Sequence, residues 1–218
     1  MRERPILFNA EMVKAILDGR KTCTRRLVKF LPGKNPQWTG YIKDGLILYN
    51  GKNEPCIRKA PYQLGDVLYV RETWGWCPCW DCGMDAVPGE CKHEKDKLYN
   101  NSKKGYGCYL YRASCEDNEY PAADTWHPSI NMPKKAARIW LQVTEVRVER
   151  LQDITEAGAA KEGCIDDIEY AKGKSARSHF IGLWNSTIKK SDVDIYGWSA
   201  NPWVWVIEFG RCGKPGKG

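Results

Sequence analysis

Residues 6–26 read ILFNAEMVKAILDGRKTCTRR, and this stretch predicts a strand, a helix and a basic segment in immediate succession. The apolar residues of 5–8 are typical of a short buried strand, and Asn9 can cap the following helix. An apolar stripe at helical spacing continues to about Asp18, and Gly19 is placed to end the helix. The stripe consists of Met12, Val13, Ile16 and Leu17. The basic segment, 20–26, then carries four cations among two threonines and one cysteine.

Beyond this stretch, the sequence alternates predicted strands with a few isolated helices. The signals are apolar–polar alternation, β-branched and aromatic runs, and capping residues at both ends of the helical patterns. Strands are expected at 39–51 (a hairpin with Asp44-Gly45 as its turn), 64–74, 137–151 (one long strand or a strand pair) and 201–209, and helices at 153–163 and 175–188. This mixture predicts an α+β domain built around a small mixed β-barrel flanked by helices.

The composition is that of a folded protein with a mild positive charge. The 218 residues include 34 Lys and Arg against 27 Asp and Glu, a net charge of +7 that suits a polyanionic partner. A chain of this length can bury one substantial core, so we expect a single domain over 1–218, with a flexible basic tail at 211–218. We find no apolar run typical of a signal peptide or membrane span, and therefore expect a cytoplasmic protein without a membrane partner.

Residues 75–128 differ in composition from both flanks, and we expect them to be a cysteine-rich insertion into the barrel. Disulfides explain ten cysteines poorly in a cytoplasmic protein, which leaves metal ligands or buried thiols. Cys79 and Cys82 have the spacing with which two thiolates bind one tetrahedral ion. The favoured interpretation is structural zinc, and incidental reduced thiols are the alternative. The predicted zinc ligands are Cys77, Cys79, Cys82 and Cys91, with His93 or Cys108 as replacements.

Lys21 and Thr24 form a candidate base and nucleophile in the basic segment. A threonine hydroxyl needs a neighbour that accepts its proton, and a lysine can do so only where burial or nearby cations favour its neutral form. Arg20, Arg25 and Arg26 could supply that field. In a regular strand, residues 21 and 24 face opposite sides, so this chemistry requires the chain to turn near Lys21. A solvated basic segment is the structural alternative.

Four segments in order resemble the successive motifs of ASCH-domain proteins, members of the PUA-like superfamily of small β-barrels linked to RNA. They are ILFNAEMVKAILDGRKTCTRR, GDVLYVRETW, DITEAGAAKEG and NPWVWVIEF. The run WHPSINMPKKAARIWLQVTEVRVERLQDIT at 126–155 resembles the long forms carried by bacteriophages and prophages. The resemblance implies a PUA-like fold for most of 5–74 and 128–209.

One bacterial branch of this superfamily removes the acetyl group from N4-acetylcytidine, and the resemblance to it implies three catalytic residues. Thr24 would attack the acetyl carbonyl and Lys21 would take the proton. Glu162 would position the lysine or shuttle protons, and Glu72 is a rival carboxylate at a strand end. The implied substrate is a modified nucleoside or nucleotide.

Other members of the family bind RNA, and one branch are ribonucleases, so the resemblance also implies a non-catalytic RNA-binding module or a ribonuclease of phage origin. In the binding interpretation, cations neutralise phosphates while Trp74 or Trp126 stacks on a base. The candidate nucleic-acid-binding residues are Arg20, Arg25, Arg26, Arg71, Trp74, Lys134, Lys135 and Arg138. His127 is the acid–base candidate for a ribonuclease. A phage accessory protein that binds another protein is the third alternative.

Overall fold

A computed structural model describes residues 2–31, 41–43, 47–49, 57, 59–79, 98–100, 105–115, 125–164, 172–173 and 175–216. Two compact units are distinguished within the chain. The first unit comprises Met1–Arg4, Ala15–Leu68 and Ile139–Gly218, and the second unit comprises Pro5–Lys14 and Tyr69–Arg138. The turn predicted at Asp44-Gly45 lies outside the described residues. The single domain over 1–218 stays a prediction.

The described residues contain ten strands, four α-helices and several short 3₁₀ helices. The strands are β1 (Glu3–Leu7), β2 (Cys23–Leu27), β3 (Tyr41–Lys43), β4 (Ile47–Tyr49), β5 (Val67–Arg71), β6 (Trp74–Pro78), β7 (Leu98–Asn100), β8 (Gly105–Tyr111), β9 (Trp140–Arg150) and β10 (Trp203–Cys212). The α-helices are α1 (Ala10–Leu17), α2 (Glu156–Ala160), α4 (Ala176–Thr187) and α5 (Val193–Tyr196). The 3₁₀ helices are Arg112–Ser114, Ser129–Asn131, Lys134–Ala136, Leu151–Asp153, Lys190–Asp192 and Trp198–Ala200.

The strands form three sheets, which with the helices confirm the predicted α+β class. Five strands are ordered β1-β5-β9-β10-β2, β3 pairs with β4, and three strands are ordered β6-β8-β7. In the part of the chain that the structure describes, β1 and β2 are the two edges of the five-stranded sheet. The closed barrel that the sequence predicted is therefore not formed by these strands. No helix among the described residues has the length and apolarity needed to cross a membrane.

The opening stretch folds as its sequence predicts. Asn9 caps α1, since its Oδ1 accepts a hydrogen bond from the Met12 N–H at 2.9 Å. Val13 and Ile16 of the predicted stripe are buried. After the helix, Gly19 has a φ of 79°, the left-handed conformation that glycine adopts without steric cost.

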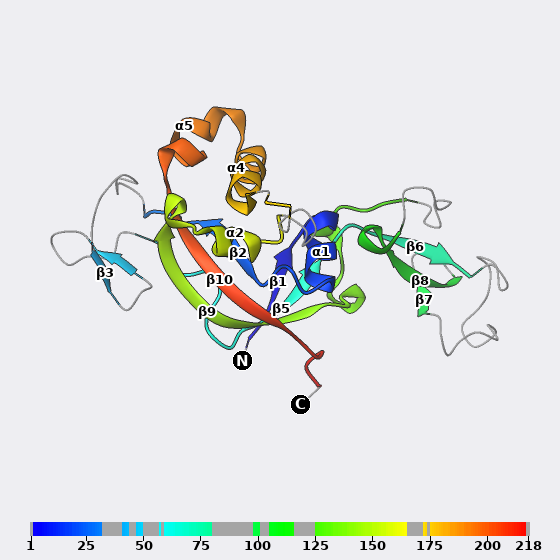
Figure 1. The fold of residues 1–218 in the computed structure, drawn as a ribbon. Coiled ribbons are helices and arrows are strands. Elements are labelled where there is room, and N and C mark those ends of the chain that lie inside the picture. Colours follow the sequence, from blue (N-terminus) through cyan, green and yellow to red (C-terminus); the bar gives the residue numbers. More distant parts are fainter. Residues whose placement is uncertain are drawn as a thin grey trace. The chain divides into compact units, whose positions relative to one another are not determined.

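The centre of the first unit is the pair of long strands β9 and β10, which Figure 1 shows side by side, with β2 along β10. Both pairings are antiparallel, and the β9–β10 register shifts between Glu208 and Phe209. Residues on both faces of β10 are buried, and on one face Val204 and Val206 pack into the core beneath α2 and α4. That core contains Cys23, Leu151, Ile154, Ala159, Ala176, Phe180, Trp184, Val204 and Val206.

The second unit contains the three-stranded sheet and a buried ion pair. Arg138 Nε and Nη2 each donate to one carboxylate oxygen of Glu72 at 2.9 Å, and the Glu72 side chain is 1% exposed. The ring of Trp74 packs on that of His127, with centroids 4.8 Å apart. The predicted insertion at 75–128 falls within this unit, and its cysteine-rich part stays a prediction.

Candidate functional site

The antiparallel pairing of β9, β10 and β2 sorts their side chains onto two faces of the sheet. Successive strand residues alternate between faces, and directly paired residues share one. One face, here called the ionic face, carries Cys23, Arg25, Glu145, Arg147, Glu149, Val206 and Glu208. The opposite face, here called the pocket face, carries Thr24, Arg26, Val146, Val148, Trp205 and Ile207.

Lys21 lies just before β2, and its ammonium group is buried at the ionic face. Its Nζ donates to the Cys23 carbonyl at 2.8 Å, the Glu162 carbonyl at 2.9 Å and Glu162 Oε2 at 2.8 Å. The Lys21 and Glu162 side chains are 0% and 4% exposed. A lysine ammonium has three protons to donate, and these three acceptors match them. The buried Lys21 Nζ therefore has an acceptor for each of its donors.

A sharp turn of the chain brings Lys21 to this position. The Lys21 N–H donates to the Ala15 carbonyl at 2.9 Å, which folds the segment back onto the end of α1. On the other side, Gly163 has a φ of 72° and packs closely. A Cβ at Gly163 would lie 2.7 Å from Ala15 Cβ and 2.9 Å from Lys21 Cβ. The turn that the sequence required near Lys21 is thus present, and only glycine fits beside it.

Arg25 connects the Lys21–Glu162 pair to a larger ionic network. Its Nη1 is 3.2 Å from Glu162 Oε1, and its Nη2 is 3.4 Å from Glu149 Oε2. Arg147 then bridges Glu149, Glu145 and Glu208, and Lys161 Nζ is 3.5 Å from Glu208 Oε2. The network joins the cations Lys21, Arg25, Arg147 and Lys161 to the carboxylates Glu145, Glu149, Glu162 and Glu208. Four positive charges meet four negative ones, which leaves this network without net charge.

Two thiols lie near this network and are poor nucleophiles. Burial, and next the negative charge of Glu162, raise the pKa of Cys23 to about 12 and that of Cys164 to about 12. Because the thiolate is the reactive form of cysteine, both side chains stay protonated and inert near neutral pH. Cys23 serves as a packing residue of the core under α2 and α4.

Thr24 is the predicted catalytic residue that the structure does not bring to this cluster. It is 4% exposed and lies on the pocket face of β2, opposite Cys23 and Arg25. Among the described residues, no hydrogen bond joins the Thr24 hydroxyl to Lys21 or Glu162. Of the three predicted catalytic residues, Lys21 and Glu162 are therefore in contact, whereas Thr24 faces the other way.

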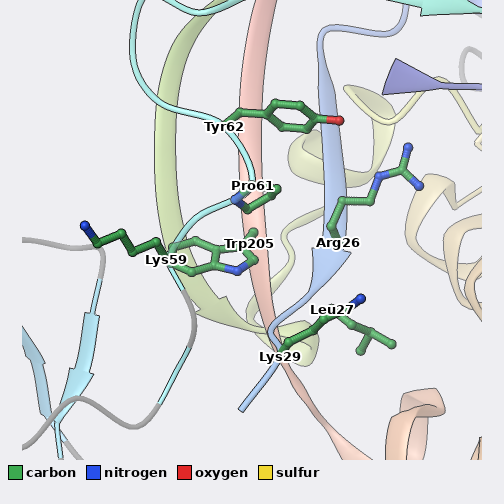
Figure 2. A pocket seen from close by; sticks show the side chains of 7 residues that line it. All are labelled: Arg26, Leu27, Lys29, Lys59, Pro61, Tyr62 and Trp205. Atoms are coloured by element: carbon green, nitrogen blue, oxygen red, sulfur yellow. The ribbon is translucent and has the colours of Figure 1, made fainter. Parts of the chain in front are cut away.

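A pocket of about 310 Å³ opens on the pocket face of the first unit. Its lining, here called the Arg26 pocket, consists of Arg26, Leu27, Lys29, Lys59, Pro61, Tyr62 and Trp205. Figure 2 shows the Arg26 guanidinium and the Tyr62 hydroxyl extending to the same side, and the Lys59 ammonium extending to the opposite side of Trp205. Burial raises the pKa of Tyr62, although Arg26 and Arg4 act to lower it, so the phenol keeps its proton.

The other predicted nucleic-acid-binding residues are dispersed. Arg20 is held by Asp18 at 2.9 Å in the first unit, and Arg138 by Glu72 in the second. Lys134 and Lys135 are exposed, with Lys134 Nζ 5.7 Å from the Tyr69 ring centroid. Arg71 Nε and Trp74 Nε1 are buried in the second unit. Arg26 is the predicted cation that lines the Arg26 pocket.

The predicted zinc site is described only in part, because Cys82, Cys91 and His93 lie outside the described residues. Cys77 and the alternative ligand Cys108 are directly paired in the β6–β8 register. Paired positions place side chains on one face of a sheet, a geometry compatible with two ligands of one ion. Over the described ranges, no three His, Cys, Asp or Glu side chains gather as a metal site would need. Zinc therefore stays a prediction.

Sequence reasoning missed the six other residues of the Arg26 pocket, among them Lys29, Lys59, Tyr62 and Trp205. The alternation in 203–207 would have placed Trp205 and Ile207 on one face. No local pattern could have joined Trp205 to the Lys59–Tyr62 segment, because the two are far apart in the sequence.

The fold and the two faces of β2 thus define an α+β protein with a basic pocket and a neutral ionic network, of which Lys21, Arg25 and Glu162 are the buried part. No family model matches the chain, and no curated protein matches it. Among solved structures, the high-resolution crystal structure of the ASCH domain from Lactobacillus crispatus JV V101 matches with 13% identity, 96% of this chain covered, 79% of that chain covered, and a TM-score of 0.36.

Proposed function

We propose that this chain is an ASCH-like, RNA- or nucleotide-binding protein and that the Arg26 pocket is its binding site. The observation that carries the proposal is the gathering of Arg26, Lys29 and Lys59 around an apolar pocket with Tyr62 and Trp205. Phosphates supply the charge that such cations bind, and bases supply the flat apolar surface that such a pocket buries.

The contrast between the two faces of β2 supports this choice. Each cation of the ionic network has a carboxylate partner, so that face offers little attraction to a phosphate. The pocket cations Arg26, Lys29 and Lys59 are exposed residues that line one pocket. A polyanion should therefore bind on the pocket face.

Binding of a labelled single-stranded RNA, followed by fluorescence anisotropy over a salt series, tests the proposal. The double variant Lys29→Glu/Lys59→Glu should bind at least about tenfold more weakly, and its salt slope should fall by about 1.4, since each phosphate contact on a single strand contributes roughly 0.7. The matched control, Lys189→Glu/Lys190→Glu, makes the same charge change at two exposed lysines of the first unit. Salt-independent binding, or equal loss in both double variants, would overturn the proposal.

The second candidate function is amidohydrolysis of N4-acetylcytidine, favoured by the buried contact between Lys21 Nζ and Glu162 Oε2 at 2.8 Å. In this reaction, Thr24 Oγ1 would form a bond to the acetyl carbon, and the bond from that carbon to N4 would break. The threonine proton would pass by way of Lys21 to N4, and water would then release acetate. Because Thr24 lies on the face of β2 opposite Arg25, this reaction would require the Thr24 hydroxyl to move within reach of Lys21 Nζ.

Release of cytidine from N4-acetylcytidine, measured by chromatography, tests this second candidate. Thr24→Ala should abolish turnover, whereas Thr22→Ala, which removes a neighbouring hydroxyl, should leave it within about twofold. Absence of cytidine, or equal turnover in wild type and Thr24→Ala, would refute it and leave the binding proposal standing.

A further inference from the structure

We infer that the Arg26 pocket binds one internal nucleotide of a single strand together with both of its flanking phosphates. One phosphate would lie at the end formed by Arg26 and Tyr62, and the other at the end formed by Lys59. This inference rests on the proposed function and specifies the ligand of the same pocket.

The distribution of charge in the pocket is the first step. Arg26 and Lys59 extend to opposite sides of Trp205 in Figure 2, so their charges do not converge on one point. A single terminal phosphate is bound best by cations that converge on it. Cations at two ends of an apolar floor instead match a nucleoside with a phosphate on each side.

The floor between the two ends is apolar. Trp205 is only 2% exposed, so its ring is a fixed base for the pocket and not a freely exposed platform. Pro61 extends this surface. A sugar and base laid across these residues would bury apolar area on side chains that need no reordering.

The size of the pocket is compatible with one nucleotide. Its volume of about 310 Å³ stands at the lower end of the range for small-molecule sites, roughly 300–1,000 Å³. The rest of a longer strand would then continue past the two cationic ends.

Tyr62 sets the chemistry of the Arg26 end. Its hydroxyl extends to the same side as the Arg26 guanidinium, and it keeps its proton because burial raises its pKa. A protonated phenol beside a guanidinium offers two kinds of donor to one phosphate. The nearby Arg4 is offset by Asp66, whose Oδ2 is 3.5 Å from Arg4 Nε.

Isothermal titration with a matched ligand series tests the inference. The ligands are cytidine, its 5′-monophosphate, its 3′-monophosphate, its 3′,5′-bisphosphate and inorganic phosphate. Each phosphate adds a charge-assisted hydrogen bond, so the bisphosphate should bind about tenfold more tightly than either monophosphate. Inorganic phosphate should bind more weakly than any nucleotide, because it leaves the apolar floor uncovered.

Two single variants then assign the phosphates to the two ends. Arg26→Ala should remove the advantage of one phosphate, and Lys59→Ala should remove the advantage of the other. Tyr62→Phe should weaken the same phosphate as Arg26→Ala, by a smaller factor. Lys190→Ala, at an exposed lysine outside the pocket, should change no affinity in the series.

The outcomes separate this inference from the proposed function. If the bisphosphate and a monophosphate bind equally well, or if Arg26→Ala and Lys59→Ala weaken the same phosphate, the two-ended arrangement is wrong although nucleotides bind. If inorganic phosphate binds as tightly as the nucleotides, the pocket is a plain anion site. If neither these ligands nor the labelled RNA bind, the proposed function itself fails.

Discussion

Lys21 Nζ lies 2.8 Å from Glu162 Oε2, although the two residues are 141 positions apart in the sequence, and both side chains are buried. A buried charge is costly to remove from water and is tolerated only when its partners remain in place. This pair ties the turn before β2 to the end of α2. Its first consequence is for folding, whatever chemistry the site performs.

Replacing Lys21 should therefore destabilise the protein strongly. Lys21→Met leaves the Glu162 carboxylate buried with Arg25 as its remaining cation, and loss of one partner of a buried pair costs about 3–5 kcal/mol. Urea unfolding followed by circular dichroism measures this loss. Lys161→Met is the matched control, because Lys161 is 53% exposed and its contact with Glu208 is 3.5 Å. That control should cost less than about 1 kcal/mol, and equal losses in the two variants would contradict the prediction.

The close packing at Gly163 leads to a second prediction. Gly163→Ala places a methyl group against Ala15 and Lys21 in addition to imposing a positive φ on alanine. Gly19 has a similar φ of 79°, but a Cβ there meets nothing within 4 Å. Gly19→Ala should thus cost about 1–2 kcal/mol from the backbone alone, and Gly163→Ala a further 1–3 kcal/mol, roughly, from overpacking. Equal free energies of unfolding for the two variants would contradict the prediction, because they would show that Ala15 and Lys21 accommodate the added methyl group without cost.

Lys21 and Thr24 show which features of the site could be predicted from the sequence and which could not. The cap at Asn9, the stripe of α1 and the helix end at Gly19 follow from local chemistry, and the structure contains them. Which face Thr24 occupies depends instead on β2 beginning at Cys23 and pairing with β10. A register between distant strands is set by the packing of both, and one segment alone does not encode it.

The pairing of distant strands also explains why Arg25 and Arg26 have different surroundings. The sequence shows Arg25 and Arg26 as equivalent neighbours, yet strand alternation sends Arg25 into the ionic network and Arg26 to the pocket. Only the paired strands distinguish a structural cation from one that is exposed to a ligand.

Glu156 should hold the start of α4. Its carboxylate accepts hydrogen bonds from the Ser175 hydroxyl at 3.2 Å, from the Arg177 N–H at 3.3 Å and from the Ala176 N–H. Glu156→Ala removes these acceptors from a helix N-terminus and should cost about 1–2 kcal/mol. Amide hydrogen exchange at Ala176 and Arg177 should accelerate in this variant. The same two amides should keep their protection in the control Asp194→Ala, which removes an exposed acidic residue from α5. Unchanged exchange in Glu156→Ala would show that Glu156 does not cap α4.

Zinc in the cysteine-rich segment is a prediction that metal analysis decides. The purified chain should contain about one zinc per molecule, and Cys77→Ser should lose it. Cys212→Ser, at a half-buried thiol of β10 in the other unit, should retain it. If Cys108→Ser also loses the metal, Cys108 is a ligand through its pairing with Cys77. A chain purified without stoichiometric zinc, or one that keeps its zinc in Cys77→Ser, would contradict the predicted ligand set.

Glu208 should make stability depend on pH in the acid range. Burial acts to raise its pKa, but hydrogen bonds from Arg147 and the charge of Lys161 outweigh this and lower the pKa below its usual value of 4.5. The unfolded chain therefore binds this proton at higher pH than the folded protein does. The stability that Glu208 contributes is present above about pH 4.5 and is lost as pH falls through the lower, folded pKa.

Urea unfolding between pH 6 and pH 3 measures this effect as the slope of the unfolding free energy against pH. Glu208→Gln should give a shallower slope than wild type below about pH 4.5, and above that pH the two slopes should agree. The same substitution made in an Arg147→Met background should change the slope much less, because Arg147 is the strongest cause of the lowered pKa. An identical slope change in both backgrounds would mean that Arg147 does not hold the Glu208 carboxylate.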